Sequence, residues 1–329
     1  MWLWLMWVQK NLTWSIPGAM VLGLLFGQVA DPAFLRHAIV PLTFLMVYPM
    51  MVTMNLRELV KPGGNRLQGV TLAINFVLMP AIGYGIGLLF FADQPLARMA
   101  LLLTALLPTS GMTISWTGFA RGNVPAAVKM TVVGLMVGSL LAPLYLKVLL
   151  GAVVDIPMLQ VFMQILLIVF LPLVLGGITQ RVLVARHGEP RFHGHYKPKF
   201  PPFSTLGVLG IVFVSMALKS QAIASQPALL LHYLWPLVLM YAINFVLSTL
   251  VGKAMFVRGD AIALVYGTVM RNLSIALAIA MGVFGEKGAD GALLIALAYI
   301  VQVQAAAWYV KLTDRLFGAL PAPHPPATS

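Results

Sequence analysis

Long apolar stretches repeat along the chain and are separated by short polar connections. An α-helix needs about 20 predominantly apolar residues to cross the hydrocarbon core of a bilayer. Ten windows of roughly this length can be placed, and they are 12–29, 34–54, 67–91, 97–119, 124–149, 158–180, 205–224, 229–257, 261–284 and 292–316. The window 205–224 is the weakest of them. The pattern predicts an all-α polytopic membrane protein with about ten transmembrane helices.

Two of these windows are interrupted at their centres. The fourth window contains Pro-Thr-Ser-Gly at 108–111, and the ninth contains Met-Arg-Asn-Leu-Ser at 270–274. A broken helix at membrane depth is tolerated only where it is packed in protein or lines a cavity, and in secondary transporters such breaks mark the substrate site. If the ten windows divide at 150–157, each interrupted window is the fourth of its half. Because five is odd, we expect two inverted five-helix repeats.

The distribution of charge fixes the expected orientation. Only 9% of the residues are charged and 60% are hydrophobic, yet the formal net charge is +12. In a soluble protein such a charge suggests nucleic acid, but here the basic residues lie mostly in short connections, as membrane insertion requires. With both termini on one side, that side carries 14 of the 21 Lys and Arg residues and the other carries 5. We expect both termini in the cytoplasm, in a bacterial cell membrane, with lipid rather than nucleic acid as the partner.

The longest connection, 181–204, is basic and rich in proline and histidine, and we expect it to be a cytoplasmic loop. It divides the chain into 1–180, which holds the first repeat and the sixth window, and 205–317, which holds the remaining four windows. Residues 318–329 are expected to be a disordered tail.

Several kinds of chemistry are excluded. The chain contains no cysteine, so disulfides, thiolate metal sites and cysteine nucleophiles are impossible. His187, His193 and His195 lack a paired acid at ligand spacing, which favours a solvated loop over a metal site. There is no Walker motif, nucleotide fingerprint or catalytic triad. We expect no metal, no cofactor and no enzymatic activity.

Arg271 lies near the middle of the ninth window, where a charge costs several kcal/mol. It is interpreted either as the counter-charge of a substrate, with Asn272 and Ser274 as polar contacts, or as a structural group bonded to carbonyls of the broken helix. No Asp or Glu lies deep inside any window. The buried charges are therefore positive, which favours an anion as substrate.

Further polar side chains surround the first break. Thr109, Ser110 and Thr113, together with Gly111, are candidate substrate contacts, although hydroxyls in membranes also bond back to their own helix. Lys129 lies about five residues inside the fifth window. It either snorkels to the surface or faces the cavity, where a buried lysine changes protonation readily and becomes a candidate proton switch.

The chain resembles the bile acid/sodium symporter superfamily in several short motifs. Those matching its fourth, fifth and ninth helices are PTSG at 108–111, FARGNV at 119–124, LAPL at 141–144, MRNL at 270–273 and ALAIA at 276–280. VYPMM at 47–51 and NLRE at 55–58 look more like its arsenite-permease branch. The resemblance implies a core of windows 3–5 and 8–10, in which the broken helices 4 and 9 cross. It also implies a panel of windows 1, 2, 6 and 7, against which the core moves.

Departures from the family pattern bear on the expected function. Sodium-coupled members have an acid at the position of Gly267, a Gln at Arg271 and an Asn at Ile114, and arsenite permeases have a cysteine in the fourth helix and an acid near Ser274. We therefore expect a sodium-independent secondary transporter of a small anion, arsenic-resistance-like by family, with Lys129 as the candidate for coupling to protons. Thiol-free efflux of arsenite or antimonite and a non-transporting membrane receptor remain as alternatives.

Overall fold

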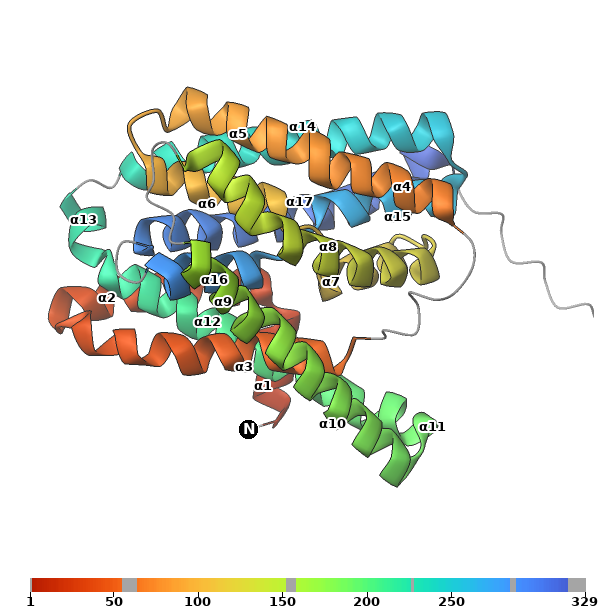
Figure 1. Ribbon diagram of the computed structural model, residues 1–329, viewed down its shortest axis with the longest axis horizontal. Helices are drawn as coiled ribbons and strands as arrows, with labels where there is room; N and C mark the ends of the chain where they lie inside the picture. Colours follow the sequence, from red (N-terminus) through yellow and green to blue (C-terminus); the bar gives the residue numbers. More distant parts are fainter. Residues whose placement is uncertain (1, 55–63, 152–157, 226–227, 285–287, 319–329) are drawn as a thin grey trace, which may run out of the picture.

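The computed structural model describes residues 2–54, 64–151, 158–225, 228–284 and 288–318, and within them every regular element is a helix (Figure 1). The elements are α1 (Trp2–Lys10), α2 (Leu12–Val29), η1 (Pro32–Ala38), α3 (Ile39–Val52), α4 (Asn65–Ala73), η3 (Ile74–Leu78), α5 (Met79–Phe90), α6 (Pro95–Leu106), α7 (Gly111–Phe119), α8 (Val124–Leu150), α9 (Met158–Ile165), η4 (Leu166–Phe170), α10 (Leu171–His187), α11 (Glu189–Arg191), η5 (Phe192–Tyr196), η6 (Lys197–Lys199), α12 (Phe200–Leu218), α13 (Ser220–Ser225), α14 (Ala228–Met255), α15 (Arg258–Val269), α16 (Leu273–Phe284) and α17 (Ala289–Phe317). The predicted all-α class is confirmed over this part of the chain.

Helices lie at each of the ten predicted windows. Within the described residues, six helical segments are long and apolar enough to cross a membrane, and they are Pro32–Val52, Asn65–Phe90, Val124–Leu150, Glu189–Leu218, Ala228–Met255 and Ala289–Phe317. Shorter apolar helices cover Trp14–Val29, Pro95–Leu106 and Leu273–Phe284. The chain is therefore an integral membrane protein of several helices, while the count of ten spans and the inverted repeat stay predictions.

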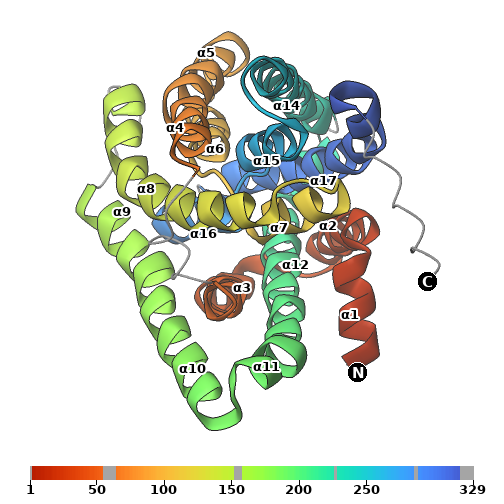
Figure 2. The ribbon, with the colours of Figure 1, turned by 90° about the vertical axis from the view of Figure 1, so that its right-hand side faces the viewer.

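The helices gather into two groups that Figure 2 shows one above the other. In the lower group α12 packs between α2 and α3, and α10 packs on α3. Glycines allow these close approaches, because a side chain at Gly207 of α12 would collide with the backbone of Met46 on α3. In the upper group α14 packs on α15 and α17, and α5 packs on α6. The division of the chain into a moving core and a panel stays a prediction.

The segment 181–204 is helical over most of its length, so the prediction of a loop was wrong. α10 continues to His187, and Arg186 and His187 in its last turn interact favourably with the negative end of the helix dipole. Gly188, with φ at +81°, turns the chain, and short helical turns lead into α12. Polar composition marks where the helix leaves the apolar layer, and the helix itself ends only at the glycine. The cytoplasmic location stays a prediction.

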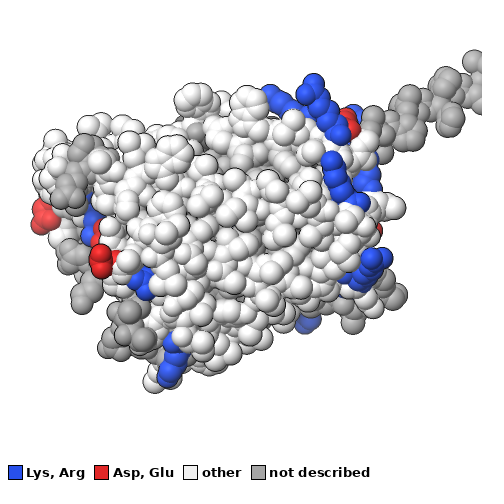
Figure 3. All heavy atoms as spheres, turned by 90° about the horizontal axis from the view of Figure 1, so that it is seen from above, with Lys and Arg blue, Asp and Glu red and all other residues white. Residues whose placement is uncertain are grey.

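Basic side chains gather at one end of the molecule (Figure 3). Three chain segments meet there. Arg258 donates from Nη1 to the carbonyl of Arg121 at 3.0 Å and forms an ion pair with Asp314 at 2.6 Å. Asn123 donates to Asp260 at 2.7 Å. The α7–α8 turn, the start of α15 and the end of α17 thus share one end, as the predicted orientation requires.

A buried arginine and an ion pair mark the opposite end. Arg98 is buried and donates to the carbonyls of Phe91 and Ala92. It thereby caps the carboxyl end of α5. Lys219, which follows α12, forms an ion pair with Asp290 of α17 at 2.9 Å.

Three predictions fall mostly on residues outside the described ranges. They concern the motif at 55–58, the link between the halves at 150–157 and the tail at 318–329.

Candidate functional site

The two predicted breaks lie against each other. Between α6 and α7, and between α15 and α16, the chain is extended, and residues 108 and 271 face one another as an antiparallel bridge. The amide of Thr109 donates to the carbonyl of Met270 and the amide of Asn272 donates to the carbonyl of Leu107, each at 2.7 Å. Both interrupted helices are therefore broken and cross at their breaks, and four half-helix ends meet at one buried place.

The sequence of the first break explains its shape. Pro108 has no amide hydrogen and cannot continue α6. Thr109 follows with φ at +61°, an unfavourable conformation for a β-branched residue. Ser110 then caps α7, because its Oγ accepts from the amide of Met112 at 3.2 Å while Thr113 Oγ1 accepts from the amide of Ser110 at 3.2 Å. Gly111 begins α7.

The predicted hydroxyl contacts have partners within the protein. Thr109 Oγ1 donates to the carbonyl of Pro108 at 2.7 Å and lies 3.3 Å from that of Thr131. Ser110 and Thr113 cap the helix, as described above, and Ser274 Oγ lies 2.7 Å from the hydroxyl of Tyr299. These bonds hold the two breaks in shape. A role for any of these hydroxyls in binding substrate stays a prediction.

Two glycines of α8 pack directly against the first break. A side chain at Gly134 would come within 2.6 Å of Thr109 Oγ1, and one at Gly138 within 3.2 Å of Pro108 Cδ. A Gly-x3-Gly pair allows another element to approach a membrane helix closely. The structure shows that the element packed against it is the break itself.

Arg271 is the most important predicted residue that the structure places in this crossing. Its side chain is 1% exposed. Nη1 donates to Asn75 Oδ1 and to the carbonyl of Ala105, each at 3.1 Å. Its backbone amide donates to Gln302 Oε1 at 2.7 Å, and its carbonyl accepts from Gln302 Nε2 at 3.3 Å. All these partners are neutral, so the positive charge is held in place without being balanced.

Three buried donors at the crossing have no hydrogen-bond partner among the described residues. They are Nε and Nη2 of Arg271 and Nδ2 of Asn272. A buried donor without a partner costs roughly 1–3 kcal/mol, and more when it is charged. A negatively charged acceptor in contact with these donors would relieve this cost, which makes the crossing a candidate anion site.

The sequence analysis missed two supporting amides. Asn75 lies in η3, a single wide turn within the third window, and its Nδ2 donates to the carbonyl of Gly267 at 2.9 Å while its Oδ1 holds Arg271. Gln302 of α17 is fully buried and also accepts from the hydroxyl of Tyr241 at 2.9 Å. In the sequence, Asn75 and Gln302 are marked only by being single amide side chains inside apolar windows.

Lys129 lies on α8 immediately before Met130 and is half-buried. Met130 and Thr131 present carbonyls to Thr109, so this part of α8 adjoins the crossing. The role of Lys129 as a proton switch stays a prediction.

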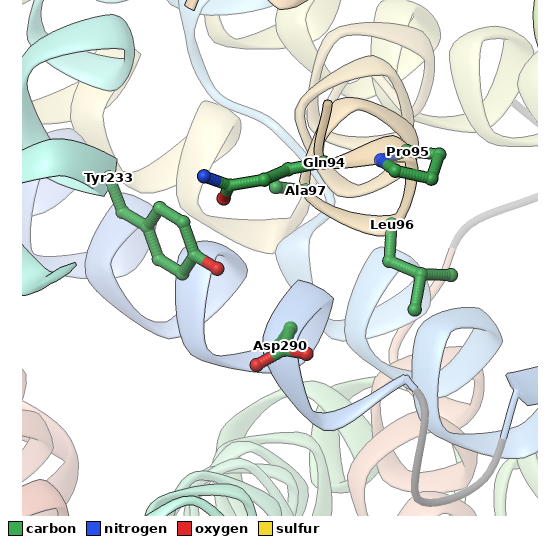
Figure 4. A pocket seen from close by; sticks show the side chains of 6 residues that line it. All are labelled: Gln94, Pro95, Leu96, Ala97, Tyr233 and Asp290. Atoms are coloured by element: carbon green, nitrogen blue, oxygen red, sulfur yellow. The ribbon is translucent and has the colours of Figure 1, made fainter. Parts of the chain in front are cut away.

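A cavity of about 190 Å³ lies elsewhere, at the starts of α6 and α17 (Figure 4). Its lining residues are Gln94, Pro95, Leu96, Ala97, Tyr233 and Asp290. Figure 4 shows the Tyr233 hydroxyl pointing towards Asp290, whose carboxylate also pairs with Lys219. The length of α6, roughly 18 Å, separates this cavity from the first break. No cluster of three or more metal-ligating side chains occurs in the described residues.

Comparison with known proteins identifies the family of the chain. Residues 40–226 match the model of the sodium bile acid symporter family. The chain is 25% identical to the arsenical-resistance protein Acr3 of Alkaliphilus metalliredigens, over 93% of this chain and 92% of that protein. It is 26% identical to the Acr3 protein of Corynebacterium glutamicum over 68% of this chain, and it spans 64% of that protein's length. The predicted resemblance is confirmed, and the chain belongs to the sodium bile acid symporter family, a family of membrane transporters.

Proposed function

We propose that the chain is a sodium-independent secondary transporter that carries a small anion across the membrane by alternating access. The observation that carries the proposal is the buried guanidinium of Arg271, which has neutral partners and two unpaired donors. The amino-terminal ends of α7 and α16 point at the same crossing, and helix amino-terminal ends attract negative charge.

The unpaired donors of Arg271 favour anions with two oxygens. Nη1 is already engaged with Asn75 and Ala105, whereas Nε and Nη2 lie along one edge of the planar guanidinium. That edge makes two parallel hydrogen bonds to a carboxylate or an oxyanion. Asn272 Nδ2 supplies a third donor nearby. The proposed substrate is therefore a small organic acid or an inorganic oxyanion.

The surroundings of Gly267 support independence from sodium. In sodium-coupled relatives the aligned position is expected to hold an acid, but here a side chain at Gly267 would come within 2.5 Å of Met130 Sδ. The Gly267 carbonyl, which could otherwise bind a cation, accepts from Asn75 Nδ2. In this proposal the positive charge of Arg271 takes the place of sodium, and Lys129 is the candidate for coupling to protons.

The test is flux of radiolabelled acetate, pyruvate, succinate, phosphate and arsenate into proteoliposomes containing the purified protein, with and without a sodium gradient. Uptake of at least one anion is expected, unchanged by sodium. Arg271→Gln should reduce it at least tenfold, because hydrogen bonds to a charged group contribute about 1.5–3 kcal/mol. Uptake by Arg271→Lys should be almost as low as uptake by Arg271→Gln, since an ammonium group cannot form the two parallel hydrogen bonds.

Arg98→Gln is the matched control, because Arg98 is also buried but binds only the carbonyl end of α5. It should lower thermal stability and leave the choice of anion unchanged. Stimulation by a sodium gradient, or equal flux through Arg271→Gln, would refute the proposal. Binding without flux would instead favour a membrane receptor.

A second candidate function is efflux of arsenite or antimonite without thiol chemistry. The relatives named arsenical-resistance proteins favour it. The absence of cysteine means that no thiolate group would contact the metalloid. Expression in a bacterium lacking its own arsenite exporters decides the matter: growth in arsenite that requires this chain supports it, and unchanged sensitivity rejects it.

A further inference from the structure

The helical segment at residues 181–199, here called the basic hairpin, extends beyond the rest of the molecule (Figures 1 and 2). It consists of the last turns of α10 with α11, η5 and η6. Its sequence contains five Lys and Arg residues, three histidines and a single acid, Glu189. The transport function proposed above uses none of these side chains.

The position of the basic hairpin relative to the bilayer follows from α10. Leu171, Val174, Ile178 and Val182 are each 43% to 58% exposed on this helix. In a membrane protein such a row of exposed apolar side chains lies against lipid tails. A helix rises 1.5 Å per residue, so Arg186 lies about 6 Å beyond Val182. The basic hairpin thus follows directly on the part of α10 that carries the exposed apolar row.

The hairpin is packed within itself, and the helix that carries it is joined to α3. Phe192 within the hairpin is 0% exposed, and the rings of His187 and Tyr196 lie 4.8 Å apart. α10 is joined to α3 where the hydroxyl of Tyr48 lies 2.7 Å from that of Thr179.

Positive groups are crowded within the hairpin. Lys199 Nζ lies 2.8 Å from His195 Nε2 and 5.8 Å from the ring centre of Tyr196. Arg186 and Arg191 are exposed on either side of the turn. The hairpin thus carries five Lys and Arg side chains within 19 residues, and an anion among them reduces the repulsion between their charges.

We propose that the basic hairpin binds the phosphate groups of anionic phospholipids at the membrane surface. Basic clusters next to a membrane helix attract anionic lipid, at about 1 kcal/mol, or roughly fivefold in affinity, for each Lys or Arg. A lipid surface presents several phosphates at the height of the hairpin, which a single free phosphate cannot do. The proposal requires only that the chain is a membrane protein and is independent of the substrate transported.

The experiment measures binding of the purified full-length protein in phosphatidylcholine nanodiscs containing 0% or 30% phosphatidylglycerol, using the rise in melting temperature and native mass spectrometry of retained lipid. Wild-type protein should be stabilised by phosphatidylglycerol and should retain it. The variant R186Q/R191Q/K199Q should lose at least tenfold of the retention. High salt should weaken the effect in wild-type protein, because the charges are exposed.

The matched control is R66Q/K253Q/K311Q, which removes three exposed charges from other helices, α4, α14 and α17. It should keep phosphatidylglycerol retention within about twofold of wild type, which is less than the fivefold expected per essential residue. Both variants should melt like wild type in pure phosphatidylcholine, which shows that they fold. Equal losses in the two variants, or equal stabilisation of wild type by inorganic phosphate, would overturn the proposal.

Discussion

At the scale of single residues, Arg271 shows how the chain holds a charge where bilayers exclude it. Neutral amide and carbonyl groups fix its Nη1 and its backbone, and no carboxylate of the described residues appears among its hydrogen-bond partners. Such a group is expensive inside a membrane. Leaving Nε and Nη2 unpaired adds to that cost. The arrangement favours an anion because only an anion relieves both costs together.

Asn75 provides a test of this arrangement at the scale of one side chain. Asn75→Ala removes the acceptor for Arg271 Nη1 and the donor for the Gly267 carbonyl. We expect a loss of about 1–3 kcal/mol in stability and at least a fivefold loss of anion affinity, because the guanidinium is no longer held. Both are measured on purified protein, by thermal melting and by anion titration.

Asn244→Ala is the comparison variant. Asn244 is likewise a buried amide, and it donates to the Thr268 carbonyl at 2.9 Å and accepts from Ser248. It should lose similar stability and keep its anion affinity. If both variants lose affinity equally, Asn75 contributes only to folding and the positioning role is wrong.

The sequence could identify Arg271 but could not identify its supports. An arginine in an apolar window is conspicuous because of its cost. A single amide such as Asn75 or Gln302 is common in membrane helices, and its importance depends on what lies opposite it. Asn75 and Arg271 are separated by 196 positions along the chain, so their contact exists only after folding. The hydroxyls of Ser110 and Thr113 are conspicuous in the sequence as candidate substrate contacts, but in the structure they form the cap of α7.

At the scale of elements, the first break depends on α8. Thr109 adopts a left-handed conformation at φ +61°, which costs roughly 1–3 kcal/mol for a residue other than glycine. Two hydrogen bonds offset that cost. The Thr109 hydroxyl donates to the carbonyl of Pro108, and the Thr109 amide donates to the carbonyl of Met270. Gly134 makes the arrangement possible because it leaves room for Thr109 against α8.

Gly134→Ala tests this packing. The added methyl group would come within 2.6 Å of Thr109 Oγ1, so the break must shift. Overpacking of this kind costs about 1–3 kcal/mol, and we expect at least a fivefold fall in anion flux with a lower melting temperature.

Gly85→Ala serves as its control, since Gly85 lies inside α5 with no heavy atom within 4 Å of an added Cβ. It should melt at or slightly above the wild-type temperature and retain full flux. Wild-type flux through Gly134→Ala would show that the break tolerates displacement.

The membrane helices and the breaks were predictable where a single sequence feature determines them. Apolar length located the membrane helices, and Pro108 located a break, because each acts through local chemistry. The ninth helix was recognised as broken from the polarity of 270–274, and the bridge between residues 108 and 271 explains how the two breaks satisfy each other's backbone groups. The end of α10 was misjudged because polar residues can extend a helix beyond the membrane as readily as they can form a loop.

At the scale of the whole molecule, the proposed mechanism requires two bodies that move. α12 and α3 would belong to the panel, while α17 and the crossing would belong to the core. The ion pair between Lys219 and Asp290 joins the end of α12 to the start of α17, beside the cavity of Figure 4. This contact would have to separate in each transport cycle, whereas contacts within one body would not.

The absence of cysteine makes this separation testable in an otherwise unmodified chain. In K219C/D290C, a short bifunctional thiol reagent with a cleavable disulfide should bridge the two bodies and abolish anion flux in proteoliposomes, and a reductant should restore it. In Y48C/T179C, the same reagent bridges α3 and α10 within the proposed panel, where the native side chains lie 2.7 Å apart. That bridge should leave at least half of the flux. The flux of each bridged variant is compared with the flux of the same variant after reduction. Full flux through the bridged K219C/D290C protein would show that α12 and α17 move together, and the division into core and panel would then be wrong.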